Sequence, residues 1–187
     1  PYDFYGLSDQ DEETRLKWSL DSVERIIRYE GGHTIAAFIF EGESGSSGCL
    51  HYPKGYLKGI KALCEKYEIL FIADEVMSGF GRTGKWFGFE HSDIIPDMIC
   101  MAKGLTSSYL PLGCLMVSDK IASKFDDSPL WLGLTYNSHP VALAAALAVI
   151  NIYESDNLIA NTNKMGAYME KRINEMRDKH PDRKSVV

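Results

Sequence analysis

The sequence predicts an α/β domain in which a mostly parallel sheet is flanked by helices. Segments with apolar residues at helical spacing alternate with short continuous apolar runs, which are typical of strands covered on both faces. No internal repeat and no long Gly/Ser linker divides the sequence. Its 187 residues, 45% of them hydrophobic, are enough for one domain with a sizeable core.

The first helix and the first strand are predicted at residues 12–30 and 34–40. Apolar residues recur at helical spacing in the first segment, and Gly31-Gly32 ends the helix. Residues 34–40 (TIAAFIF) form a continuous, partly β-branched apolar run, so we expect a strand that is buried on both faces. Small residues and acids make residues 41–48 (EGESGSSG) a loop.

The later elements continue the alternation of helix and strand. A helix is predicted after Pro53 and a buried strand at residues 68–74, so this part forms a β-α-β unit. Two further apolar runs follow at residues 98–102 and 112–117. After them come an Ala-rich helix at residues 140–153 and a polar amphipathic helix at residues 158–180.

Charge and cysteine usage narrow the class of protein. A formal net charge of -6 leaves no excess of Lys and Arg for a nucleic-acid backbone or an anionic membrane surface. The apolar runs are shorter than the roughly 20 residues of a membrane-spanning helix. The four cysteines never form a close pair, which disfavours a disulfide framework and a zinc site. We expect a cytoplasmic protein that binds no metal, no nucleic acid and no membrane.

Three predicted strands end in polar residues, at Glu41, at Asp74-Glu75 and at Lys103. In an open parallel sheet the ligand site lies at the carboxyl ends of the strands. Partial burial there disfavours the charged form of Lys103, which leaves an amine able to form an imine. The simpler alternative is a lysine whose side chain extends from the strand end into solvent.

Asp74 makes the catalytic interpretation of Lys103 stronger, because it ends a neighbouring apolar strand. A carboxylate at that place can keep a pyridinium nitrogen protonated, which makes pyridoxal phosphate an electron sink. Without such a ligand, Asp74 would be a helix cap or a turn acid. Residues 79–84 (GFGRTG) match the bare spacing of a dinucleotide-binding loop, but no helix is predicted after them, so a nucleotide-binding domain is the weaker alternative.

Three motifs together resemble those of a known family. Residues 74–84 (DEVMSGFGRTG) resemble the signature of the class III aminotransferases, and residues 98–105 (MICMAKGL) and 133–140 (GLTYNSHP) follow in the family's order and spacing. The resemblance covers residues 34–176, most of the sequence. It implies fold type I of the pyridoxal-phosphate-dependent transferases, with this chain as an incomplete large domain.

The resemblance also implies roles for individual residues. Lys103 would hold pyridoxal phosphate as a Schiff base, and Asp74 would pair with its ring nitrogen. Val76 would pack on one face of the ring, and Met77 would lie beside the cofactor. Thr135 would reach the cofactor phosphate of a neighbouring subunit, which implies a homodimer; read alone, Thr135 would be a helix N-cap.

Some positions depart from the family pattern. Many members have Glu-Pro where this chain has Glu41-Gly42. At the position of Met77, many have an amide side chain that can donate a hydrogen bond, which a methionine side chain cannot do. Ser46 stands where the ornithine and γ-aminobutyrate enzymes have a glutamate that pairs with a substrate-gating arginine. Glu41 and Ser46 are therefore expected near the substrate. With residues 108–113 (SYLPLG), these features look closest to the taurine:pyruvate aminotransferase branch.

The implied reaction moves an amino group from an ω-amino acid or amine, taurine among them, to a keto acid such as pyruvate, by a ping-pong Schiff-base mechanism. We expect residues 1–155 to be part of the cofactor-binding large domain and residues 156–187 to be a helix leading to a small C-terminal domain that is missing. The chain would then be a fragment, and in isolation it would be inactive. The alternative is a non-catalytic structural fragment that does not bind the cofactor on its own.

Overall fold

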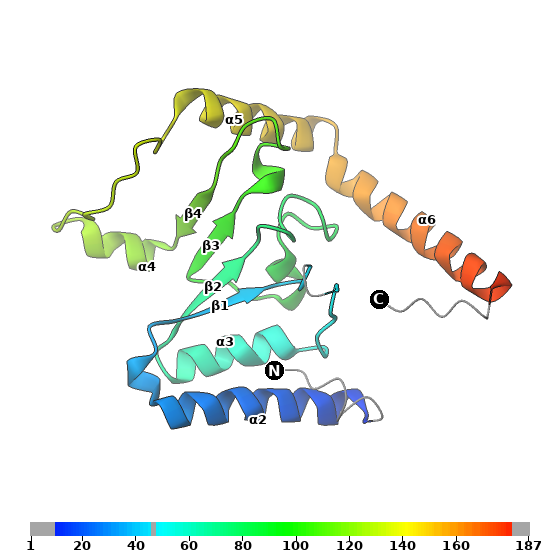
Figure 1. Ribbon diagram of the computed structural model, residues 1–187, viewed down its shortest axis with the longest axis horizontal. Coiled ribbons are helices and arrows are strands. Elements are labelled where there is room, and N and C mark those ends of the chain that lie inside the picture. The colour runs from blue at the N-terminus through cyan, green and yellow to red at the C-terminus, as the bar shows by residue number, and fades with distance from the viewer. Residues whose placement is uncertain (1–9, 46–47, 181–187) are drawn as a thin grey trace.

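The computed structural model describes residues 10–45 and 48–180, and its centre is a four-stranded sheet in the order β1-β2-β3-β4 (Figure 1). Strands β1 (Ala37–Glu41), β2 (Leu70–Asp74) and β3 (Met98–Met101) are parallel to one another. Strand β4 (Cys114–Val117) is antiparallel to β3. The prediction of a mostly parallel sheet flanked by helices is confirmed, with one antiparallel strand at its edge.

Two helices form the layer that packs on β1 and β2. Helix α2 (Glu12–Glu30) begins at the N-cap Asp11, whose side chain accepts a hydrogen bond from the Thr14 N–H, and ends at Gly31. Helix α3 (Tyr56–Lys66) lies between α2 and the sheet (Figure 1). The largest core cluster joins these helices to the two strands through the buried side chains of Val23, Ile27, Phe40, Tyr56, Ile60, Cys64 and Phe71.

A second cluster holds helix α5 (Pro140–Ser155) against the end of β3. Its buried members are Phe80, Met101, Leu105 and Ala146. Helix α6 (Leu158–Lys179) follows α5 and extends away from the sheet (Figure 1). The described part of α6 has no buried residue, and its apolar side chains are exposed at Met165, Tyr168, Met169, Ile173 and Met176.

Strand β1 differs from its prediction in two respects. It begins at Ala37, because residues 32–34 form the 3-10 helix η1 (Gly32–Thr34), in which the Thr34 hydroxyl donates to the carbonyls of Glu30 and Gly31 at 2.9 and 2.8 Å. The expectation that both faces of the strand are covered is wrong. Ile39 is 60% exposed, because α2 and α3 cover only the face that carries Phe40.

Short elements connect the strands and helices. They are the 3-10 helices η2 (Gly88–Ser92), η3 (Lys103–Leu105) and η4 (Ser123–Phe125) and the single-turn helix α4 (Asp119–Ala122). The four cysteines are free thiols. Within residues 10–45 and 48–180, no single helix has the length and apolar character to cross a membrane, and no cluster of three or more His, Cys, Asp or Glu side chains could hold a metal ion.

Candidate functional site

Three of the predicted site residues lie at one edge of the sheet. Glu41 and Asp74 are register partners at the ends of β1 and β2, and Asp74 is in turn the register partner of Cys100 in β3. Lys103 follows the last residue of β3, Met101, by two positions. The parallel pairing therefore gathers Glu41, Asp74 and Lys103 at the carboxyl ends of adjacent strands, where open α/β sheets bind their ligands.

Lys103 has an unusual backbone conformation. Its φ of 39° lies in the left-handed region, which costs a non-glycine residue about 1–3 kcal/mol and persists only where the surroundings enforce it. The following turn does so, because the Leu105 N–H donates to the Ala102 carbonyl at 2.9 Å and the Leu105 side chain is buried. The expected partial burial of Lys103 is wrong for this chain: the residue is exposed, so a ligand can reach its amine.

Gly104 joins the lysine segment to the loop of residues 79–84. A Cβ atom at Gly104 would lie 2.7 Å from the Cβ of Phe80, closer than real Cβ atoms approach, so only glycine fits here. The Phe80 ring packs edge-on against the Phe87 ring at a centroid distance of 5.7 Å. The backbone N–H of Phe80 donates to the Trp86 carbonyl at 2.7 Å. No α-helix follows this loop, which removes the nucleotide-binding alternative.

Asp74 is half-buried, and one oxygen of its carboxylate is already used. Its Oδ1 accepts a hydrogen bond from the Val76 N–H at 3.1 Å, so Asp74 is a turn acid in part. Among the described residues, Oδ2 takes part in no hydrogen bond. Burial, and next the charge of Asp74, raise the pKa of the Cys100 thiol, as expected for a carboxylate at the neighbouring register position.

Glu75 is a residue of the site whose importance the sequence did not indicate. It is 0% exposed, and its carboxylate accepts hydrogen bonds from the Ser78 hydroxyl at 2.6 Å, the Gly88 N–H at 2.8 Å and the Phe89 N–H at 2.9 Å. The only available signal was an acid beside Asp74 in a segment rich in small residues. Its partners at 88–89 are distant in sequence, so that signal could not reveal them.

The next residues turn toward the loop that follows β1. Val76 is half-buried, and Met77 is 42% exposed with its Cε 2.7 Å from the place a Cβ would take at Gly45. The predicted substrate-side residue Ser46 lies outside the described residues. Around it, an antiparallel bridge joins Ser44 to Leu50.

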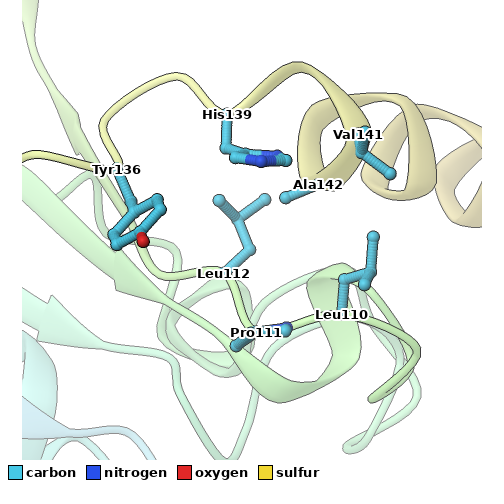
Figure 2. A pocket seen from close by; sticks show the side chains of 7 residues that line it. All are labelled: Leu110, Pro111, Leu112, Tyr136, His139, Val141 and Ala142. Atoms are coloured by element: carbon cyan, nitrogen blue, oxygen red, sulfur yellow. The ribbon is translucent and has the colours of Figure 1, made fainter.

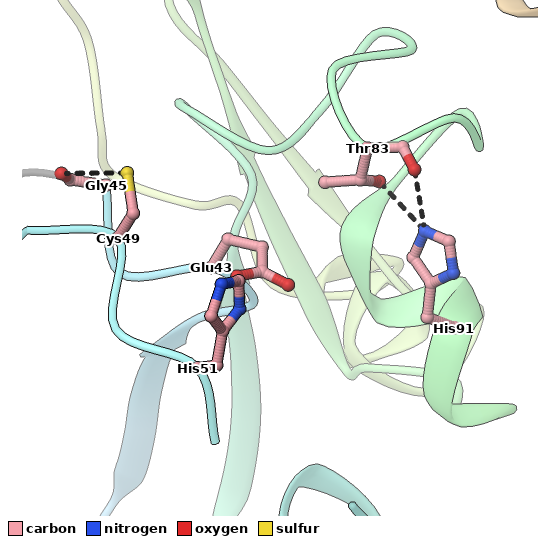
Figure 3. Close-up of polar contacts among 6 residues, drawn as sticks. All are labelled: Glu43, Gly45, Cys49, His51, Thr83 and His91. Carbon is pink, nitrogen blue, oxygen red and sulfur yellow. Dashed lines mark hydrogen bonds and ion pairs between the residues drawn. The ribbon is translucent and has the colours of Figure 1, made fainter. Parts of the chain in front are cut away.

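Figure 3 shows polar contacts of the loops after β1 and β2. His51 Nδ1 lies 3.7 Å from Glu43 Oε2, and His91 Nε2 lies 3.0 Å from the Thr83 hydroxyl oxygen. Burial, and also the charges of Glu41 and Glu43, raise the pKa of Tyr52, while a hydrogen bond with Ser44 lowers it. The edge beside Glu41 is therefore polar and acidic.

Thr135, unlike Glu41, Asp74 and Lys103, does not follow a strand of the sheet. It is exposed in the connection from η4 to α5. The N-cap of α5 is His139, so Thr135 does not cap that helix. Beside Thr135 lies an apolar cavity of about 390 Å³ (Figure 2). Its lining residues are Leu110, Pro111, Leu112, Tyr136, His139, Val141 and Ala142.

The residues at the sheet edge fit pyridoxal phosphate. The exposed Lys103 amine can bind an aldehyde carbon, and Oδ2 of Asp74 is open to a protonated ring nitrogen. Val76 supplies an apolar surface next to Asp74. The fold and the site together define the class, a pyridoxal-phosphate-dependent transferase with an α/β large domain.

Comparison with known proteins agrees with this class. A family model described as aminotransferase class-III matches residues 2–187. The chain is 39% identical to the diaminobutyrate–2-oxoglutarate transaminase of Halomonas elongata over 97% of its own length and 40% of that protein. It is also 39% identical to the putrescine–pyruvate aminotransferase of Pseudomonas aeruginosa, with the same 97% and 40% coverage.

Solved structures show the same likeness. The taurine:2-oxoglutarate aminotransferase of Bifidobacterium kashiwanohense, in complex with pyridoxal phosphate and glutamate, is 40% identical with a TM-score of 0.88 over 91% of this chain and 38% of that one. This chain belongs to the class III aminotransferase family, and the cofactor of that family is pyridoxal phosphate. It spans about 40% of the length of the curated relatives.

Proposed function

We propose that the enzyme carrying this chain transfers an amino group from an ω-amino acid or amine to a keto acid such as pyruvate, with pyridoxal phosphate as cofactor. The observation that carries this proposal is the placing of Lys103 and Asp74 at the ends of adjacent parallel strands. Relatives named for diaminobutyrate, putrescine and taurine support amine donors of this kind.

Each residue at the sheet edge has a distinct task. When bound, pyridoxal phosphate supplies an electron sink for the charge left on the substrate carbon. Lys103 would hold the cofactor through its amine, and the same amine would move a proton from and to the substrate carbon. Oδ2 of Asp74 would accept a hydrogen bond from the ring nitrogen and keep it protonated. Val76 would pack on one face of the ring and exclude water from it.

We propose taurine as one amino donor, and we propose that the loop at residues 42–50 recognises it. A taurine aminotransferase is among the similar structures at 40% identity, and Met77 contacts Gly45 of this loop. The putrescine and diaminobutyrate relatives are equally similar, so the donor has to be measured. Initial rates with taurine, putrescine and γ-aminobutyrate at fixed pyruvate distinguish these donors, and double-reciprocal plots that are parallel for amine and keto acid support the ping-pong order.

We further propose that the enzyme is a cytoplasmic homodimer in which Thr135 reaches the cofactor phosphate of the neighbouring subunit. Thr135 is exposed, so a second subunit can reach its side chain. The four free thiols fit a reducing compartment. We also propose that residues 1–155 belong to the cofactor-binding domain and that residues 156–187 lead toward a second domain.

The covalent role of Lys103 is the decisive test. Adding pyridoxal phosphate to the full enzyme should produce a visible absorbance band that disappears on borohydride reduction and is absent in Lys103→Ala. Lys124→Ala is a matched control, because Lys124 is an exposed lysine in η4, away from the sheet edge. A band that persists in Lys103→Ala would contradict the proposal.

The same titration distinguishes the second candidate, a non-catalytic fragment. We expect the isolated 187-residue chain to bind pyridoxal phosphate weakly and to show no transamination, because it spans only about 40% of the length of the relatives it matches. Each lost charge-assisted hydrogen bond to the phosphate weakens binding by about 1.5–3 kcal/mol. Saturable binding below micromolar cofactor by the isolated chain would contradict this expectation.

A further inference from the structure

We propose that Glu75 is a positioning residue that fixes the direction in which Asp74 presents its carboxylate. The proposal rests on the proposed function, because the position of Asp74 matters only if it holds the ring nitrogen. Glu75 does not face the ligand edge; its carboxylate is fully buried and bonded within the protein.

The side chain of Glu75 connects the end of β2 to the beginning of η2. Its Oε2 accepts from the Ser78 hydroxyl and the Gly88 N–H, and its Oε1 accepts from the Phe89 N–H. No ion pair with Glu75 occurs within the described ranges. A buried carboxylate without a cation is tolerated only when its oxygens receive such hydrogen bonds, so all three donors are needed to hold it in place.

The backbone of Glu75 is held as firmly as its side chain. Its N–H donates to the Cys100 carbonyl of β3 at 2.9 Å, and its carbonyl accepts from the Gly79 N–H at 2.9 Å. A Cβ at Gly79 would lie 2.7 Å from the Glu75 carbonyl oxygen, so this turn tolerates no side chain at that position. Residue 75 is therefore bound to β3 on one side and to residues 88–89 on the other.

This anchoring determines the conformation of Asp74. The Val76 N–H donates to Asp74 Oδ1, so the position of residue 76 decides which carboxylate oxygen remains open. Glu75 lies between the two residues and sets the position of that N–H. If Glu75 lost its bonds to residues 88–89, Val76 could shift and Asp74 could rotate, although neither residue would have been changed.

Glu75→Gln tests the charge with almost no change in shape. A glutamine has one acceptor oxygen, and its amide group is a donor that would face a backbone N–H instead of accepting from it. Ser78→Ala is the milder variant, because it removes one donor and keeps both backbone bonds. Ser19→Ala is the matched control: Ser19 is also 0% exposed and donates one hydrogen bond, to the Arg15 carbonyl at 2.7 Å within α2.

The experiment uses the enzyme loaded with pyridoxal phosphate and three measurements. Amide hydrogen exchange at Gly88 and Phe89 should accelerate by about tenfold or more in Glu75→Gln, as expected for one lost hydrogen bond to a charged group. The pH midpoint of the cofactor's visible absorbance should shift, because Asp74 holds the ring nitrogen less well. The kcat should fall about 10- to 100-fold while KM for the amine changes little, as misplacement of a catalytic group does.

The controls separate positioning from general stability. Ser78→Ala should change all three measurements in the same direction by smaller amounts, whereas Ser19→Ala should leave the absorbance midpoint unchanged. If Glu75→Gln does not fold, the comparison of Ser78→Ala with Ser19→Ala decides, because only Ser78→Ala should shift the absorbance midpoint. An unchanged absorbance midpoint in Glu75→Gln or Ser78→Ala would overturn this inference alone, whereas the lack of a visible band in the unsubstituted enzyme would overturn the proposed function as well.

Discussion

Asp74 and Glu75 are adjacent carboxylates with opposite surroundings. Successive side chains of a strand point to opposite faces, so two neighbouring acids at a strand end reach different environments. Asp74 is half-buried and keeps Oδ2 without a hydrogen bond among the described residues, while Glu75 is completely buried and bonded through both oxygens. The sequence pair Asp-Glu thus supplies one carboxylate for a ligand and one for the protein.

We expect Asp74→Ala in the full enzyme to retain covalent cofactor binding and to slow proton transfer by orders of magnitude. The substitution leaves Lys103 in place but removes the carboxylate that keeps the ring nitrogen protonated. Single-turnover absorbance after mixing with the amine measures this step directly. Asp178→Ala, on the exposed surface of α6, is the control and should react at the normal rate. Near-normal turnover of Asp74→Ala would remove Asp74 from the site.

Burial gives Cys64 a low thiol reactivity. It raises the pKa of this thiol from 9.0 to about 11, and the residue is 0% exposed in the core beneath β2. A thiol pKa raised by about two units has about 100-fold less thiolate at pH 8, so alkylation of Cys64 should be slower than that of the exposed Cys49 by at least this factor. Mass spectrometry after iodoacetamide treatment measures both rates, and urea should remove the difference.

The raised pKa also predicts a stability change with pH. The folded state favours the neutral thiol, so the stabilisation is fully present below the unfolded pKa near 9.0 and is lost as the pH rises toward about 11. Urea unfolding at pH 8 and pH 10.5 measures the loss. Cys64→Ala should show a smaller decrease in unfolding free energy between these pH values than the unsubstituted chain.

At the level of elements, the helices were more predictable than the strand arrangement. Helix α2 spans the predicted residues 12–30 and ends at the predicted glycine, Gly31, because helix periodicity and a glycine stop are local signals. The direction of β4 was not predictable, since an apolar run carries no information on which way the strand runs. The three bonds of Glu75 could not be predicted either, because Gly88 and Phe89 meet it only after the chain has folded. The positions of Lys103 and Asp74 at strand ends could be predicted, because both interrupt apolar runs.

Gly104→Ala tests the contact between the lysine segment and the loop at Phe80. The added Cβ would lie 2.7 Å from the Phe80 Cβ, so we expect a loss of about 1–3 kcal/mol in the free energy of unfolding. Gly166→Ala is the matched control in α6, where an added Cβ meets nothing within 4 Å. It should stabilise the chain by about 0.5–1 kcal/mol through helix propensity. Equal effects of the two substitutions in urea unfolding would show that the Phe80 contact is unimportant.

At the level of the whole molecule, the predicted cofactor contacts fall into two groups. Lys103, Asp74 and Val76 gather at the carboxyl edge of the sheet, and Thr135 lies in the connection from η4 to α5, next to Tyr136 of the apolar cavity. In the proposed homodimer, Thr135 of one chain would complete the site at Lys103 and Asp74 of the other.

Mixed dimers test whether Thr135 acts on the neighbouring subunit. We expect Thr135→Ala to raise the cofactor Kd about tenfold or more, because a hydrogen bond to a charged phosphate contributes about 1.5–3 kcal/mol. A dimer of one Lys103→Ala and one Thr135→Ala subunit should then contain one intact site if Thr135 acts across the interface. Activity at limiting cofactor near half that of the unsubstituted dimer supports this arrangement; activity no higher than that of the Thr135→Ala dimer contradicts it.

The reversed direction of β4 decides where residues 102–113 lie. A parallel fourth strand would need a crossover of about a dozen residues or more across a face of the sheet. Because β4 is antiparallel, with Cys114 paired to Met101, the chain returns at the edge that carries Asp74 and Lys103. Insertions or deletions here can reshape the cavity wall at Leu110–Leu112 without changing the strand order. The length of this return can thus vary while the four strands keep their pairing.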